Sequence, residues 1–179
     1  DRGAPNRMIV AVDVRRPSAW KTIVAESPHV IESAILAGGR LFIEHLVDVK
    51  SRLGMFDLVG KPRGEVPLPA AGSISAFFGR GDASTFFYAF TSHLYPTTVF
   101  SYDIASGASE PFERAKPPVD VSRYETTQLF AASKDGTRVP FFLTARKGLA
   151  RDGSNPTMLY AYGGFSVSVM PGYRPDVPA

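Results

Sequence analysis

The residues of this chain best suited to chemistry lie in one short stretch, Tyr160-Ala161-Tyr162-Gly163-Gly164-Phe165. A tyrosine hydroxyl keeps its proton at neutral pH, so it can donate a hydrogen bond to an oxyanion that develops in a transition state. Tyr162 stands directly before the glycine pair, where the chain can turn sharply because glycine accepts positive φ. Phe165 follows the turn and can wall an apolar pocket. The same residues also suit a core strand with a tight turn, so the interpretation depends on the rest of the chain.

Other groups that commonly carry catalysis form no complete constellation in this sequence. Gly107-Ala108-Ser109 and Gly164-Phe165-Ser166 are near matches to the Gly-x-Ser-x-Gly nucleophile elbow, but both lack its second glycine. His29, His45 and His93 are far apart and form no metal-binding pair of the His-Glu-x-x-His type. We therefore expect structural roles for these serines and histidines, with no metal and no cofactor.

Composition excludes several classes of protein. The 179 residues are 44% hydrophobic and 12% aromatic, which is normal for a chain that buries a core. Lys+Arg 20 and Asp+Glu 17 are scattered along the chain, so no basic face predicts nucleic-acid binding. The absence of cysteine excludes disulfides, zinc-thiolate sites and a cysteine nucleophile. No apolar run reaches the roughly 18 residues of a membrane span. We expect a soluble monomer, cytoplasmic or periplasmic, and a piece of a longer protein because the first residue is Asp1.

The elements that must position Tyr162 begin with the run 158–162. Its continuous apolar character predicts a buried strand of a parallel sheet. Loops at the carboxyl ends of such strands usually carry the ligand sites of α/β proteins. Tyr160 shares the side of Tyr162 by the two-residue period but lies deeper, so we expect it in the core.

Residues 6–118 read as short β-type runs separated by turn signals, which predicts a sandwich, barrel or propeller with little helix. The expected strands cover 8–12, 20–24, 33–36, 40–47, 55–59, 65–68, 74–78, 85–91 and 98–104. A weak internal repeat pairs Leu41-Phe42-Ile43 with Phe86-Phe87-Tyr88 at an offset of about 44 residues, close to the roughly 40–50 of a propeller blade. At this period the segment 6–118 holds about two blades and part of a third.

The sequence pattern changes at Pro117-Pro118, which predicts a domain boundary between about 115 and 125, because a double proline does not suit a central strand. Beyond it, runs 127–132 and 138–144 flank Asp135-Gly136, which is the strongest local signal for a β-hairpin. Pro140 lacks an N–H group and so predicts that the second strand lies near an edge.

These motifs together resemble one known family, the prolyl oligopeptidases. The resemblance is carried by Thr127-Gln128-Leu129-Phe130, Ser133-Lys134-Asp135-Gly136-Thr137, Arg138-Val139-Pro140-Phe141-Phe142, Lys147-Gly148 and Tyr160-Ala161-Tyr162-Gly163-Gly164-Phe165. It implies a mainly β fold, with the last blades of a seven-bladed β-propeller in residues 1–118. The first strands of an α/β-hydrolase catalytic domain would follow in residues 119–179.

The resemblance also implies a function. Tyr162 matches the oxyanion-hole tyrosine of the family, and Phe165 matches an aromatic wall of the pocket for the substrate proline. The parent protein would be a serine endopeptidase that cleaves short peptides on the carboxyl side of proline. The oligopeptidase B branch typically has Gly-Ser-Tyr-Gly where this chain has Gly163-Gly164-Phe165-Ser166, which favours the prolyl branch.

The family's Ser, Asp and His triad lies downstream of the matched region, so we expect this chain alone to be inactive. Two alternatives stay open. One is a non-catalytic propeller that serves as a binding module. The other is a related oligopeptidase of different specificity, such as an acylaminoacyl-peptidase or a dipeptidyl-peptidase relative.

Overall fold

The structure is a computed structural model that describes residues 3–114, 116–165 and 167–175. Within these residues the chain is mainly β, as predicted, with one short 3-10 helix, η1 (Val121–Arg123). The strands are β1 (Ile9–Val12), β2 (Trp20–Val24), β3 (Val30–Ala37), β4 (Arg40–Val47), β5 (Lys50–Phe56), β6 (Pro62–Val66), β7 (Ser73–Phe78), β8 (Thr85–Ser92), β9 (Tyr95–Asp103), β10 (Ser109–Arg114), β11 (Tyr124–Ala132) and β12 (Arg138–Arg146).

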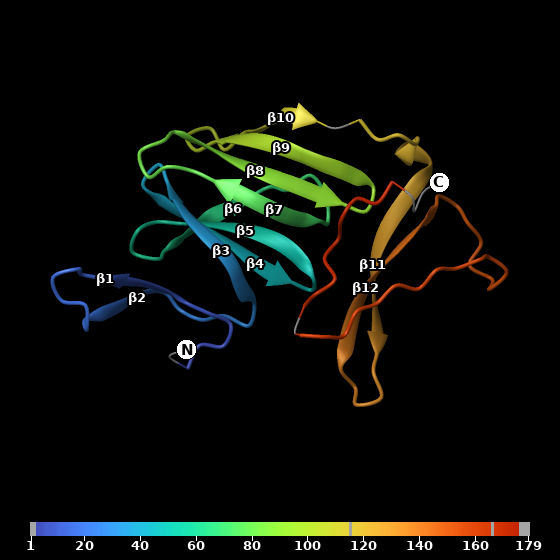
Figure 1. Ribbon diagram of the computed structural model, residues 1–179, viewed down its shortest axis with the longest axis horizontal. Helices are drawn as coiled ribbons and strands as arrows, with labels where there is room; N and C mark the ends of the chain where they lie inside the picture. Colours follow the sequence, from blue (N-terminus) through green and yellow to red (C-terminus); the bar gives the residue numbers. More distant parts are fainter. Residues whose placement is uncertain (1–2, 115, 166, 176–179) are drawn as a thin grey trace.

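Two four-stranded antiparallel sheets make up the centre of the molecule (Figure 1). Their strand orders are β3-β4-β5-β6 and β10-β9-β8-β7, so each sheet is a meander of consecutive strands. Phe42 on β4 and Phe86 on β8 each lie on the second strand of their sheet, and both are fully buried. The repeat predicted from the sequence is therefore confirmed as two copies of the four-stranded unit typical of a propeller blade. A separate two-stranded sheet, β1-β2, precedes them.

The hydrophobic core lies between these two sheets. Along β8 the side chains of Phe86, Tyr88 and Phe90 are buried, whereas Phe87 between them is partly exposed, because successive strand residues point to opposite faces. The buried cluster consists of Ala37, Phe42, Leu53, Val66, Ile74, Phe77, Phe86, Tyr88, Phe90, Phe100, Tyr102 and Ile104. Aromatic rings from both sheets meet in it, which joins the two repeats into one packed body.

Two strand predictions in this region are wrong in position, and one strand was not predicted. The strand expected at 65–68 is β6, which begins at Pro62. The strand expected at 55–59 is β5, which runs earlier, because Asp57 begins a turn in which its carboxylate accepts from the N–H groups of Val59 and Lys61. Strand β10 is absent from the predicted strands. Pro111 is tolerated there because β10 is the edge strand of its sheet and has a register irregularity at that point.

The hairpin predicted around Asp135-Gly136 is confirmed. Among the described strands, β11 and β12 pair only with each other, and Pro140 is accommodated in β12 opposite Phe130. The turn closes with a hydrogen bond from the N–H of Ser133 to the carbonyl of Thr137, and Gly136 adopts a φ of 84°. Figure 1 shows this hairpin standing beside the two central sheets.

The buried strand predicted for residues 158–162 is not present. This segment has no regular structure in the described chain, Leu159 is 90% exposed, and Tyr160 is also exposed rather than in the core. A strand is stabilised by hydrogen bonds to a neighbour, and no described strand pairs with this run. Apolar character alone therefore does not make it a strand here.

Candidate functional site

The turn that follows Tyr162 is tight. The N–H of Val167 donates to the carbonyl of Gly164 at 3.1 Å, which folds the chain back on itself. A Cβ atom built on Gly164 would lie 2.9 Å from the Tyr162 hydroxyl oxygen. Glycine at this position therefore lets the phenol approach the backbone of the turn, and the phenol stays half-exposed at the start of the turn.

Phe165 has an unusual backbone conformation for a phenylalanine. Its φ is 56°, in the left-handed region that favours glycine, and its side chain is 93% exposed. Such a conformation costs on the order of 1–3 kcal/mol, and it is found most often at functional sites. The turn thus presents a bare aromatic ring three positions after a tyrosine hydroxyl. The strand expected before this turn is absent from the described residues.

The chain that continues from this turn lies against the ends of β7 and β8 (Figure 1). Ser73 Oγ donates to the carbonyl oxygen of Pro171 at 2.6 Å, and the N–H of Tyr173 donates to Thr91 Oγ1 at 3.1 Å. Pro171 is fully buried by this contact. We call the hydroxyls of Ser73 and Thr91 the anchor.

A cavity of about 660 Å³ lies between this docked segment and the central sheets. Its lining includes Glu32, Ser33, Glu44, Ser73, Thr91 and Pro171. This volume is within the roughly 300–1,000 Å³ of common ligand sites. Hydroxyl and carboxylate groups lie in this wall beside apolar side chains such as Leu46, Ile74 and Met170.

Glu44 is the most deeply buried carboxylate of this wall, with 6% of its surface exposed. Its two oxygens accept from Ser33 Oγ at 2.7 Å and from Ser51 Oγ at 2.6 Å. Burial raises the pKa of Glu44, and the two serine hydrogen bonds oppose that rise only in part. Ser51 Oγ also accepts from the N–H of Ile74 at 2.8 Å, so the network connects the first central sheet with the second.

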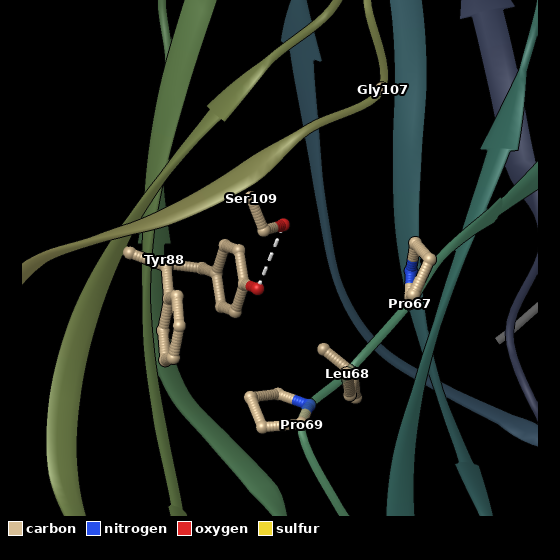
Figure 2. Close-up of a pocket in the computed structure, with 7 residues that line it drawn as sticks. Pro67, Leu68, Pro69, Tyr88, Gly107 and Ser109 are labelled. Atoms are coloured by element: carbon tan, nitrogen blue, oxygen red, sulfur yellow. Dashed lines mark hydrogen bonds between the residues drawn. The ribbon is translucent and has the colours of Figure 1, made fainter.

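A second pocket, of about 310 Å³, lies between the segment that follows β6 and the strands β8 and β9 (Figure 2). Pro67, Leu68, Pro69 and the stacked rings of Tyr88 and Phe100 give it an apolar wall. Its polar groups, Tyr88 Oη and Ser109 Oγ, bond to each other at 3.1 Å. Burial raises the pKa of Tyr88, so this pair offers no general base. The pocket shares no residue with the Tyr162 turn, and we assign it to packing.

Of the three histidines, His45 lies on β4, whereas His29 and His93 lie in connecting segments. Burial lowers the pKa of His45 on β4, with the charges of His29 and Arg52 acting in the same direction. Burial also lowers the pKa of His93, whose ring lies 5.3 Å from the ring of Phe142 on β12. Among the residues that the structure describes, no three His, Asp or Glu side chains are grouped to hold a metal ion. Ser166, the serine of one near-match elbow, lies outside the described residues.

Sequence reasoning missed Ser73, Thr91 and Glu44. A carboxylate inside the apolar run Leu41-Phe42-Ile43-Glu44 was an available signal, because a charge in a buried strand needs partners. The two anchor hydroxyls had no comparable signal, since their partners are backbone atoms 98 and 82 positions away.

None of the helices in the described part of the chain has the length and apolar character that a membrane span requires.

The comparisons with known proteins identify the family. Residues 1–115 match the family model described as "Prolyl oligopeptidase, N-terminal beta-propeller domain".

Individual relatives give the same family name. The chain is 34% identical over 175 residues to a prolyl endopeptidase of Elizabethkingia meningoseptica, and 35% identical over 177 residues to one of Elizabethkingia miricola. Each alignment covers 97% of this chain and 25% of the relative, so the chain spans about a quarter of the length of these relatives.

A solved structure from a structural and mechanistic analysis of two prolyl endopeptidases matches with a TM-score of 0.88 and 38% identity. The match covers 97% of this chain and 26% of the solved chain. The repeated four-stranded sheets, the match of residues 1–115 and these relatives agree, and the chain therefore belongs to the prolyl oligopeptidase family.

Proposed function

We propose that this chain is part of a serine endopeptidase that hydrolyses short peptides on the carboxyl side of proline. In this proposal residues 1–118 form the C-terminal part of a seven-bladed β-propeller, and residues 119–179 begin the α/β-hydrolase catalytic domain. The Ser, His and Asp of the triad would come from sequence outside these 179 residues. Membership of the prolyl oligopeptidase family supports the reaction class.

Tyr162 would supply one of the two hydrogen bonds to the oxyanion. When a serine attacks the peptide carbonyl and a histidine takes its proton, the carbonyl oxygen becomes an anion. A phenolic hydroxyl held at that oxygen stabilises the charge more in the transition state than in the substrate. Its place directly before a tight turn, with Gly164 leaving room beside the hydroxyl and half of the side chain exposed, supports this role.

Phe165 would supply an aromatic wall for the substrate proline. The proline ring has an apolar face and its nitrogen carries no hydrogen, so a flat aromatic side chain can select it by packing. The observation that carries this part of the proposal is the 93% exposed ring at a φ of 56°. A strained backbone and a bare aromatic side chain are both unfavourable unless the ring has a partner.

The experiment is a substrate panel with the full-length protein. Matched peptides with proline, alanine or lysine before the scissile bond are compared, and an active-site serine is tested with a fluorophosphonate reagent. The proposal expects kcat/KM for proline at least about 100-fold above that for alanine, a difference that shape selection plus orientation can supply. Preference for lysine would instead assign a related oligopeptidase. No hydrolysis and no labelling would make the protein a non-catalytic binding module.

A further inference from the structure

The anchor is part of the packed interior. Ser73 and Thr91 face each other in the register of β7 and β8, so their two hydroxyls form one site at the end of the second central sheet. Both side chains are buried. Immediately before Ser73, the carbonyl of Gly72 accepts from the N–H of Ser51 at 2.9 Å, and after it the N–H of Ile74 donates to Ser51 Oγ. Since neighbours on both sides are bonded to the first sheet, the anchor has a fixed place in the fold.

The segment held by the anchor has little other support in the described chain. Residues 158–165 pair with no described strand, and Val167 and Val169 are exposed. Only around Pro171 does this part of the chain become fully buried. The chain from Phe165 to Pro171 spans at most about 20 Å when fully extended. Holding Pro171 therefore confines where the turn can lie.

We infer that Ser73 and Thr91 are positioning residues, which hold the turn carrying Tyr162 and Phe165 at a fixed place relative to the propeller sheets. This inference rests on the proposed function of Tyr162. The bonds to the carbonyl of Pro171 and the N–H of Tyr173 are to backbone atoms, so they fix the path of the chain whatever its side chains. Oxyanion stabilisation depends on donor placement within about 0.5 Å, so an anchored turn favours the transition state.

The first arm of the test measures docking itself in the full-length protein. Thr91→Val removes the acceptor for the Tyr173 N–H while keeping the side-chain shape, and Thr91→Ser keeps the hydroxyl. Amide hydrogen exchange at Tyr173 should accelerate about fivefold in Thr91→Val, the effect of losing one hydrogen bond, and stay near wild type in Thr91→Ser. Equal exchange rates at Tyr173 in wild type, Thr91→Val and Thr91→Ser would overturn the proposed anchor.

The second arm measures catalysis on a peptide with proline before the scissile bond. Ser73→Ala combined with Thr91→Val should lower kcat about 10- to 100-fold with KM little changed, because misplaced catalytic groups cost rate more than binding. Ser101→Ala, which removes a half-buried hydroxyl of β9 outside the anchor, serves as the control. A loss seen only in KM would overturn the inference.

The third arm repeats the anchor variant in a Tyr162→Phe background. If the anchor acts through Tyr162, removing the hydroxyls of Ser73 and Thr91 from the Tyr162→Phe protein should change its kcat less than about twofold, because the effects of coupled residues are not additive. An equal loss in both backgrounds would overturn the inference. Tyr162→Phe alone reports on the proposed function: unchanged kcat would reject the donor role, while the exchange at Tyr173 would still judge the docking separately.

Discussion

Phe42 and Phe86 belong to different sheets, yet their ring centroids lie only 4.5 Å apart and neither side chain is exposed. Each residue lies on the second strand of its sheet, β4 or β8, so their contact is where one four-stranded unit packs on the next. The stability of this part of the propeller should therefore depend on the pair more than on rings at the open face of β10.

Phe42→Ala tests this in urea unfolding of the 179-residue chain. Truncating a fully buried phenylalanine should lower the free energy of unfolding by about 3–5 kcal/mol, through lost burial and the cavity left behind. Phe112→Ala, at a position 69% exposed, is the control and should cost less than about 1 kcal/mol. Similar losses of unfolding free energy in Phe42→Ala and Phe112→Ala would contradict the placement of Phe42 in the core.

Glu44 predicts a specific pH dependence of stability. Burial raises its pKa in the folded chain above the ordinary 4.5, so the folded state binds the proton more tightly than the unfolded state. Its contribution to stability is fully present below about pH 4.5 and is lost as the pH rises through the raised pKa. Relative to Glu44→Gln, wild type should therefore lose stability as the pH rises above 4.5.

Glu65→Gln is the matched control for this pH series. The hydrogen bond from Arg52 lowers the pKa of Glu65, so its contribution is present above pH 4.5 and is lost as the pH falls. The differences of the two variants from wild type should therefore slope in opposite directions. Parallel curves for wild type and Glu44→Gln would mean that Glu44 titrates as an exposed carboxylate.

Phe165→Ala should weaken the discrimination for proline in the full-length protein. We expect kcat/KM for a proline peptide to fall about 10-fold and for its alanine analogue less than about threefold, since only proline loses its packing partner. Phe165→Leu keeps an apolar wall, so its discrimination for proline should lie between those of wild type and Phe165→Ala. Equal losses on both substrates would show that Phe165 has only a structural role.

The parts of the fold that could be predicted from the sequence depend on local signals. The two four-stranded sheets are visible as a repeated pattern, in which Leu41-Phe42-Ile43 resembles Phe86-Phe87-Tyr88. Asp135-Gly136 marks a hairpin because both residues suit its turn. The position of β5 was predicted wrongly because the side chain of Asp57 makes a turn inside what reads as a β run. The error moves the bounds of the strand by a few residues, because pairing with β4 sets the register of β5.

The residues of the candidate site could be proposed from the sequence, whereas the contacts that hold their segment could not. Tyr162 and Phe165 could be singled out because their types and spacing suggest a chemistry. The contact of Ser73 with Pro171 could not, because it joins a side chain to a backbone atom 98 positions away. The run 158–162 was predicted as a strand from its apolar character, whereas a strand also needs a partner that no local pattern specifies.

Tyr162→Phe in the full-length protein tests the central claim most directly. The substitution removes one hydroxyl and keeps the ring, and Tyr160→Phe makes the same chemical change two positions earlier. Steady-state kinetics on a peptide with proline before the scissile bond should show kcat lowered about 10²-fold with KM little changed for Tyr162→Phe, as for other oxyanion donors. Tyr160→Phe should remain near wild type. An unchanged kcat in Tyr162→Phe would contradict the account.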